Sequence, residues 1–133
     1  MTMQASGTFE VKLNPLPAHA ATADAKLGRM SIDKQFKGDL EGTSQGEMLS
    51  AMTDVKGSAG YVAIERVSAT LNGRRGTFVL QHNATMYRGE PFLNIIVVPD
   101  SGSGELAGLS GSMRIVIADG MHSYEFDYAL APA

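Results

Sequence analysis

The sequence predicts an all-β protein, a closed eight-stranded antiparallel barrel in which each strand pairs with the next (a meander). Three observations predict it: fifteen glycines among 133 residues, β-branched residues gathered in short runs, and tight-turn dipeptides between those runs. Closing an up-and-down sheet of this size pairs its two edge strands with each other. At this length we expect one domain, residues 1–133.

The first third of the chain supplies two strands and a long loop. Ser6–Leu13 alternates polar with apolar residues, as a half-buried strand does. Two prolines within residues 14–23 predict a long loop, and we assign no role to His19 inside it. Leu27–Phe36 is the next strand. Its more apolar face carries Met30, Ile32 and Phe36.

The third predicted strand, Leu40–Thr53, follows a turn at Gly38-Asp39. A two-residue loop there would place a polar set of side chains on the face that carries Met30. That set is Glu41, Thr43, Gln45 and Glu47, together with Leu49. Either the pairing register shifts by one residue, or the inner face of this part of the barrel wall is in contact with water. The sequence leaves both alternatives open.

Residues 60–84 predict a hairpin that turns at Asn72-Gly73, the strongest short-range hairpin signal. A two-residue loop pairs Val67 with Phe78, and Ala63 with His82. The more apolar face, which we assign to the interior, carries Tyr61, Ala63, Glu65, Val67, Ala69 and Leu71 with Phe78, Leu80, His82 and Ala84. Glu65 and His82 are then diagonal neighbours inside the barrel. A three-residue loop would separate them, so this inference depends on loop length.

The last part of the chain predicts three more strands. Phe92–Val98 is apolar on both faces, which predicts the barrel interior on one side and a lid or partner subunit on the other. A loop with one helical turn near Glu105–Leu109 follows. Ser112–Ala118 and His122–Leu130 then form a hairpin about Asp119-Gly120. Its inner face includes His122 and Tyr124, and its outer face pairs Arg114 with Glu125.

Composition narrows the classes of function and compartment. The chain has no cysteine, which excludes disulfides, thiolate nucleophiles and thiolate metal sites. The net charge is -3 with scattered Lys and Arg, so no electrostatic footprint for nucleic acid exists. We find neither a signal-peptide pattern nor an apolar run of membrane-spanning length. The expected location is therefore cytoplasmic, without a membrane partner.

Three passages together resemble a known family: Tyr61-Val-Ala-Ile-Glu65, Gly73-Arg-Arg-Gly-Thr-Phe-Val-Leu-Gln-His82, and Ser101-Gly-Ser-Gly-Glu-Leu-Ala-Gly-Leu-Ser-Gly111. They resemble a family of small bacterial proteins catalogued as a domain of unknown function, over most of the chain after about residue 30. The resemblance implies a closed eight-stranded meander barrel similar to plant allene oxide cyclase and, more distantly, to dirigent proteins. It implies no activity, because the family has none assigned and shared fold is only an analogy for function.

The inward carboxylate and imidazole carry the candidate chemistry. Glu65 and His82 could act as a general acid/base pair, or they could be a structural pair that satisfies two buried polar groups. With His122 they would make a two-histidine, one-carboxylate set of the kind that holds iron or zinc, although His122 is more simply placed at the barrel rim. We predict no cofactor and no metal. The predicted ligand-contacting residues are Tyr61, Glu65, His82, Asn94, His122 and Tyr124.

Three functions remain open. The preferred one is a binding module whose lumen takes a small, mainly apolar molecule. The second is an enzyme of isomerase or cyclase type, in which a rigid cavity restricts the substrate and the Glu65/His82 pair moves a proton. The third is a barrel filled by side chains that acts as a homo-oligomer through Phe92–Val98.

Overall fold

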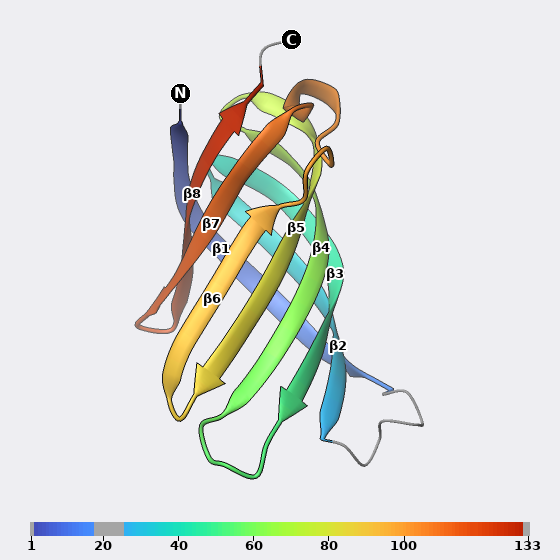
Figure 1. Cartoon of the computed structure of the whole chain (residues 1–133). Coiled ribbons are helices and arrows are strands. Elements are labelled where there is room, and N and C mark those ends of the chain that lie inside the picture. The colour runs from blue at the N-terminus through green and yellow to red at the C-terminus, as the bar shows by residue number, and fades with distance from the viewer. Residues whose placement is uncertain (1, 18–25, 132–133) are drawn as a thin grey trace.

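The computed structural model describes residues 2–17 and 26–131, which form a closed antiparallel barrel (Figure 1). Each strand pairs with its neighbours in sequence and the last pairs with the first, so the predicted fold class is confirmed. The strands are β1 (Met3–Leu16), β2 (Leu27–Gly38), β3 (Leu40–Met52), β4 (Ala59–Leu71), β5 (Arg74–Tyr87), β6 (Glu90–Val97), β7 (Leu109–Ala118) and β8 (Met121–Leu130). No helix among the described residues is long and apolar enough to span a membrane.

Two hairpins have the predicted register because their turns contain two residues in the left-handed region. Asn72 and Gly73 have φ of 45° and 86°, which matches the twist of the flanking strands. As a result Glu65 pairs with Leu80, and Ala63 with His82, as predicted. The β7–β8 hairpin turns in the same way at Asp119 and Gly120, and it pairs Ile117 with His122 and Arg114 with Glu125.

The β2–β3 pairing resolves the alternative that the sequence left open. Ile32 pairs with Gly46, and Phe36 with Gly42, so the register is one residue away from that of a two-residue Gly38-Asp39 loop. This shift turns the polar side chains of β3 outward. Leu40, Ser44 and Met48 face inward instead. The inner face of β2 and β3 is therefore largely apolar, apart from Lys34 and Ser44.

The predicted loop over residues 14–23 is wrong at its start. Asn14, Pro15 and Leu16 continue β1 and pair with β2. β8 pairs with β1 only as far as Phe9, so the far edge of β1 is free at Pro15. A proline is tolerated there because it lacks only an amide proton that would have pointed away from the sheet. His19 lies outside the described residues.

One half of the barrel interior is filled by side chains. The buried core gathers aromatic and aliphatic residues from all eight strands, and Leu106 of the 3-10 turn η2 (Gly104–Leu106) packs into it. Phe78 stacks on Phe126 with ring centroids 5.9 Å apart, and Phe126 stacks on Tyr128 at 5.4 Å. This half therefore leaves no room for a ligand.

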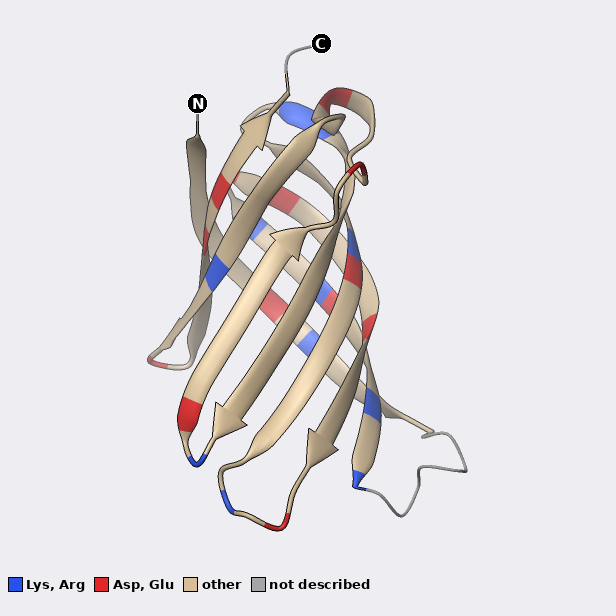
Figure 2. Cartoon of the chain, in the orientation of Figure 1, with Lys and Arg blue, Asp and Glu red and all other residues tan. Residues whose placement is uncertain are grey.

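The other half, at the lower end in Figure 1, is open. β6 and β7 pair only at Ile95–Met113 and Ile96–Ser112, and below that point they separate (Figure 1). Inward-facing side chains near this opening are consequently exposed, among them Leu13 at 44% and Leu93 at 40%. Charged residues are scattered over the strands and turns without a face of one sign (Figure 2). The opening is thus the feature that distinguishes one end of the molecule.

Candidate functional site in the barrel interior

Four polar side chains meet in the middle of the barrel, and we call them the Glu65 cluster: Lys34, Ser44, Glu65 and His82. All four are buried. Lys34 Nζ donates to Glu65 Oε2 at 2.8 Å, and His82 Nε2 lies 2.6 Å from the same oxygen. Ser44 Oγ donates to Glu65 Oε1 at 2.9 Å. Both carboxylate oxygens are therefore occupied.

Strand alternation and one glycine put the cluster together. Glu65 and His82 lie on adjacent strands and share the inner face, as predicted. Gly46 pairs with Glu65, and a Cβ at Gly46 would lie 2.0 Å from the Ile64 carbonyl oxygen. The absence of a side chain at Gly46 thus lets β3 approach β4 closely beside the carboxylate. The Lys34 ammonium lies 5.0 Å from the centroid of the Phe9 ring, a cation–π contact.

The cluster holds Glu65 in its ionised form. Burial raises the pKa of this carboxyl, but the hydrogen bond from His82 and the charge of Lys34 outweigh burial and lower the pKa to about 2. Because the carboxylate is charged, the His82 Nε2 atom beside it carries a proton and donates a hydrogen bond to the carboxylate oxygen. The carboxylate charge is thus compensated by the Lys34 ammonium, and both carboxylate oxygens accept hydrogen bonds within the cluster.

Lys34 and Ser44 were not predicted from the sequence as residues of the site. Lys34 has the same parity as Met30, Ile32 and Phe36, so the alternation of β2 already contained the signal for an inward lysine. Ser44 depended on the β2–β3 register, which the sequence left open. The sequence around Lys34 or Ser44 does not indicate that Glu65 is the partner, because Glu65 lies 31 residues from Lys34 and 21 residues from Ser44.

Two predicted tyrosines lie inside the barrel with different surroundings. Tyr124 is 1% exposed, and its hydroxyl accepts from the Leu40 N–H at 2.9 Å and donates toward the Leu40 and Lys37 carbonyls. It therefore ties β8 to the β2–β3 turn and has a structural role. Tyr61 is half-buried, on the inner face of β4 nearer the open end than Glu65. Burial, and then the charge of Glu65, raise its pKa.

Two other predicted residues do not join the Glu65 cluster. His122 is half-buried and packs against Phe9, with ring centroids 5.2 Å apart. Within the described residues no three histidine, aspartate or glutamate side chains are placed to hold a metal ion. The placement of Asn94 in the lumen is wrong, because β6 turns Ile95 inward and Asn94 outward, where it donates to Asn83 at 3.1 Å.

A recess of about 350 Å³ lies at the open end, and we call it the lower cup. Its lining comes from β3, β4, β5 and β6: Met48, Ser50, Met52, Ala59, Gly60, Tyr61, Ala84, Thr85, Met86, Pro91, Phe92 and Leu93. The Glu65 cluster and the filled half of the barrel lie deeper. Apart from Tyr61 and Ala84, sequence reasoning did not single out this lining, because methionines spaced along two strands give no local motif.

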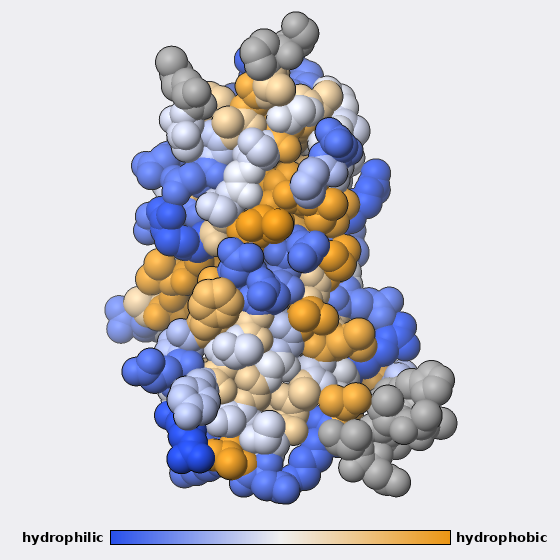
Figure 3. All heavy atoms as spheres, in the orientation of Figure 1, coloured by the Kyte–Doolittle hydropathy of each residue, from blue (hydrophilic) through white to orange (hydrophobic). Residues whose placement is uncertain are grey.

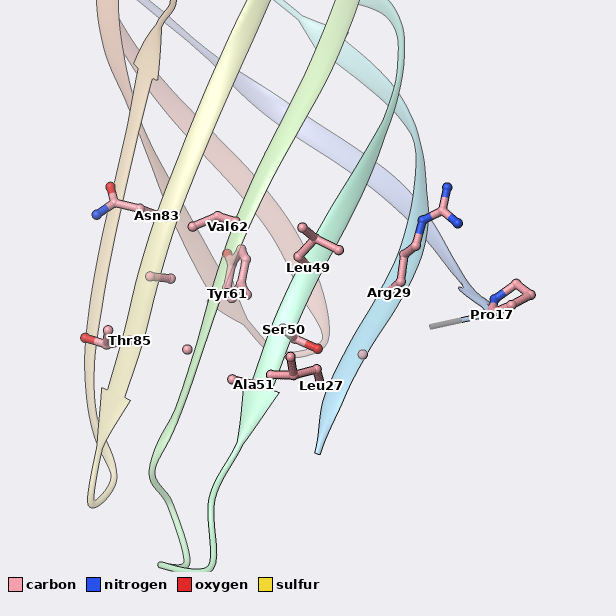
Figure 4. A pocket seen from close by; sticks show the side chains of 13 residues that line it. Pro17, Leu27, Arg29, Leu49, Ser50, Ala51, Tyr61, Val62, Asn83 and Thr85 are labelled. Carbon is pink, nitrogen blue, oxygen red and sulfur yellow. The ribbon is translucent and has the colours of Figure 1, made fainter. Parts of the chain in front are cut away.

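A second recess, the outer groove, lies on the outside of the wall and measures about 790 Å³. Leu49, Val62 and Asn83 lie along it on three successive strands (Figure 4). Leu49 and Val62 are more than half exposed, at 57% and 52%. The two linings share Ser50, Gly60, Tyr61, Ala84 and Thr85, whereas Leu49 and Val62 line the groove alone and Met48 and Leu93 line the cup alone.

Comparisons with known proteins agree with this fold. The family model described as "Protein of unknown function (DUF3224)" matches residues 5–128. A crystal structure of a DUF3224 family protein of unknown function from Shewanella oneidensis MR-1 is 54% identical to this chain. The two chains cover each other completely, with a TM-score of 0.95. No curated protein matches the sequence.

Proposed function

The chain belongs to the DUF3224 family, whose description assigns no activity, and we propose that this barrel is a binding module for a small, mainly apolar molecule held in the lower cup. The observation that carries the proposal is the cup itself. It is concave, lined chiefly by apolar side chains, and lies at the end of the barrel where β6 and β7 separate. Its volume of about 350 Å³ falls within the range of ligand sites, about 300–1,000 Å³.

The Glu65 cluster supports binding better than acid–base catalysis. A general base works best with a pKa near the operating pH, whereas the pKa of Glu65 is lowered to about 2. Its two oxygens also hold three hydrogen bonds already. We therefore assign the cluster the role of a rigid floor that separates the filled core from the cup. The geometry of Glu65 weighs against an isomerase or cyclase that uses it as the base.

A cavity-filling variant tests the proposal. Ala84 faces the cup between Tyr61 and Leu93, so Ala84→Phe places an aromatic ring in the binding volume. Val62→Phe is the matched control, because Val62 adjoins Tyr61 but lies in the outer groove. The probe is N-phenyl-1-naphthylamine, an uncharged fluorophore whose emission rises in apolar sites, and native mass spectrometry of the purified protein checks for a retained guest.

We expect wild type and V62F to bind the probe and A84F to bind it at least about tenfold more weakly, with circular dichroism confirming that all three fold. Binding by A84F that equals wild type would refute the cup as the site. A loss confined to V62F would move the site to the outer groove.

A second copy of this chain is the partner we propose for the outer wall. Phe92 is 55% exposed on β6, and Ile64 is 51% exposed on the same wall. Hydrophobic residues also form several groups at mid-height on the face that presents β6, with hydrophilic residues between them (Figure 3). Such a surface is typical of self-association when it is larger than scattered single residues. Native mass spectrometry of wild type and Ile64→Asp tests this, because Ile64, unlike Phe92, does not line the cup: the variant should be monomeric, and an unchanged oligomeric state would refute the contact.

A further inference from the structure

We infer that the ligand of the lower cup is an uncharged aromatic molecule that carries a carbonyl or hydroxyl oxygen. The inference rests on the binding function proposed above and names its ligand class. Three features of the cup lead to it: the absence of charged lining residues, two hydroxyl groups near its deep end, and several thioether sulfurs around its wall.

The first feature argues against a charged ligand. No acidic or basic side chain lines the cup. The nearest ionised groups described deeper in the barrel, Glu65 and Lys34, compensate each other at 2.8 Å. A carboxylate or ammonium group entering the cup would lose its hydration without gaining a counter-ion, which is costly. Tyr61 shows the same effect, because burial and the charge of Glu65 raise its pKa and so disfavour an anion there.

The second feature gives the ligand its polar atom. Tyr61 and Ser50 pair across β3 and β4 and both line the cup. Ser50 Oγ lies on the inner side, where a Cβ at Gly28 would come within 2.9 Å of it. Burial and the charge of Glu65 raise the pKa of Tyr61, so its hydroxyl keeps its proton and can donate a hydrogen bond. A ligand oxygen placed here would accept that proton.

The third feature favours a flat, polarisable body. Met48, Met52 and Met86 line the cup, and Met30 pairs with Met48 on the neighbouring strand. Thioether sulfur makes favourable contacts with aromatic rings, about 0.3–1.5 kcal/mol each, and unbranched methionines adapt their rotamers to the ligand. Leucine or valine walls would fit an aliphatic chain equally well without this preference. The cup is therefore better matched to an aromatic ring than to a fatty acyl chain.

Three naphthalene compounds of the same ring system test the class: 2-acetylnaphthalene, 2-naphthoate and naphthalene. Because the chain contains no tryptophan, their fluorescence can be followed without overlap from the protein's indoles. We expect the ketone to bind most tightly and the carboxylate at least about tenfold more weakly. Tyr61→Phe should weaken the ketone by about 2- to 10-fold, the value of one hydrogen bond, and leave naphthalene unchanged.

The outcomes separate this inference from the binding function. If A84F weakens all three compounds but the carboxylate binds as tightly as the ketone, the cup is the site and the ligand class is wrong. An equal effect of Y61F on ketone and naphthalene would refute the hydrogen bond. If no compound binds, or A84F changes none of them, the binding function itself fails.

Discussion

Glu65 and Lys34, 31 residues apart in sequence, form an ion pair inside the barrel, with Oε2 and Nζ 2.8 Å apart. Their side chains are 0% and 6% exposed, so neither charge is compensated by bulk water. Removing two charges from water costs several kcal/mol per ion, and only close pairing with additional hydrogen bonds offsets it. His82 and Ser44 supply those bonds. The two charges are therefore stable in the barrel interior only because each is compensated by the other.

Lys34→Met should therefore destabilise the protein strongly. The variant keeps an aliphatic side chain of similar length but leaves the Glu65 carboxylate buried without its cation. Removing one partner of a buried pair costs about 3–5 kcal/mol. Equilibrium unfolding in urea at neutral pH measures the change in the free energy of unfolding.

The exposed ion pairs of Arg114 with Glu125 and Asp127 provide the control. Arg114→Ala should leave the free energy of unfolding close to that of wild type, because water screens these pairs. The double variant K34M/E65Q should recover part of the loss of K34M, since it removes the uncompensated charge. If K34M unfolds at the wild-type urea concentration, the buried pair does not have the importance we assign to it.

Acid should weaken the fold through Glu65 over a defined range of pH. The folded-state pKa is lowered from the ordinary 4.5 to about 2, so Glu65 contributes stability above about pH 4.5. That contribution falls as pH drops through this window toward 2, because the unfolded chain then binds the proton more readily. The difference corresponds to about 3 kcal/mol. Urea unfolding at several pH values between 6 and 2.5 measures it.

Glu65→Gln isolates this contribution, because glutamine has the same shape and does not titrate. The variant should show a smaller loss of stability between pH 4.5 and 2.5 than wild type does. Parallel pH curves for the two proteins would show that other carboxyl groups cause the acid sensitivity.

The sequence predicted those parts of the barrel that local turn chemistry determines. Asn72-Gly73 and Asp119-Gly120 each adopt a left-handed two-residue turn, so the register of both hairpins, and the shared face of Glu65 and His82, followed from the sequence. Gly38-Asp39 failed as a guide because the β2–β3 register does not fit a two-residue loop. A turn dipeptide therefore predicts the pairing register of its hairpin only where its two residues make up the whole loop between the strands.

The contacts that the sequence did not predict join distant strands. Lys34 reaches Glu65 across β3, and no local pattern shows which inward lysine meets which carboxylate. The lower cup takes its lining from four strands at the end where β6 and β7 separate, and this arrangement depends on the closure of the whole barrel. Asn94 was misplaced because Phe92–Val98 is apolar on both faces, and such a strand gives no parity signal.

Tyr124→Phe should cost stability although it removes one oxygen atom only. The Tyr124 hydroxyl accepts the Leu40 N–H at 2.9 Å, and Leu40 is fully buried. Without the hydroxyl this backbone donor is left unpaired, which costs about 1–3 kcal/mol. Thermal unfolding by circular dichroism measures the change. Tyr87→Phe is the control, because Tyr87 is 70% exposed, and equal melting temperatures for the two variants would contradict the role of Tyr124.

Gly46→Ala should disrupt the wall beside Glu65, whereas Gly60→Ala, on the adjacent strand β4, should be tolerated. A Cβ at Gly46 would lie 2.0 Å from the Ile64 carbonyl oxygen and 2.6 Å from the Glu65 Cα, both backbone atoms that cannot rotate away. At Gly60 the nearest atom is 3.5 Å away, an ordinary contact. Overpacking of this kind costs about 1–3 kcal/mol, and more where backbone must move. Urea unfolding of both variants measures the difference, and a G46A protein as stable as G60A would show that β3 and β4 can separate at Glu65 without cost.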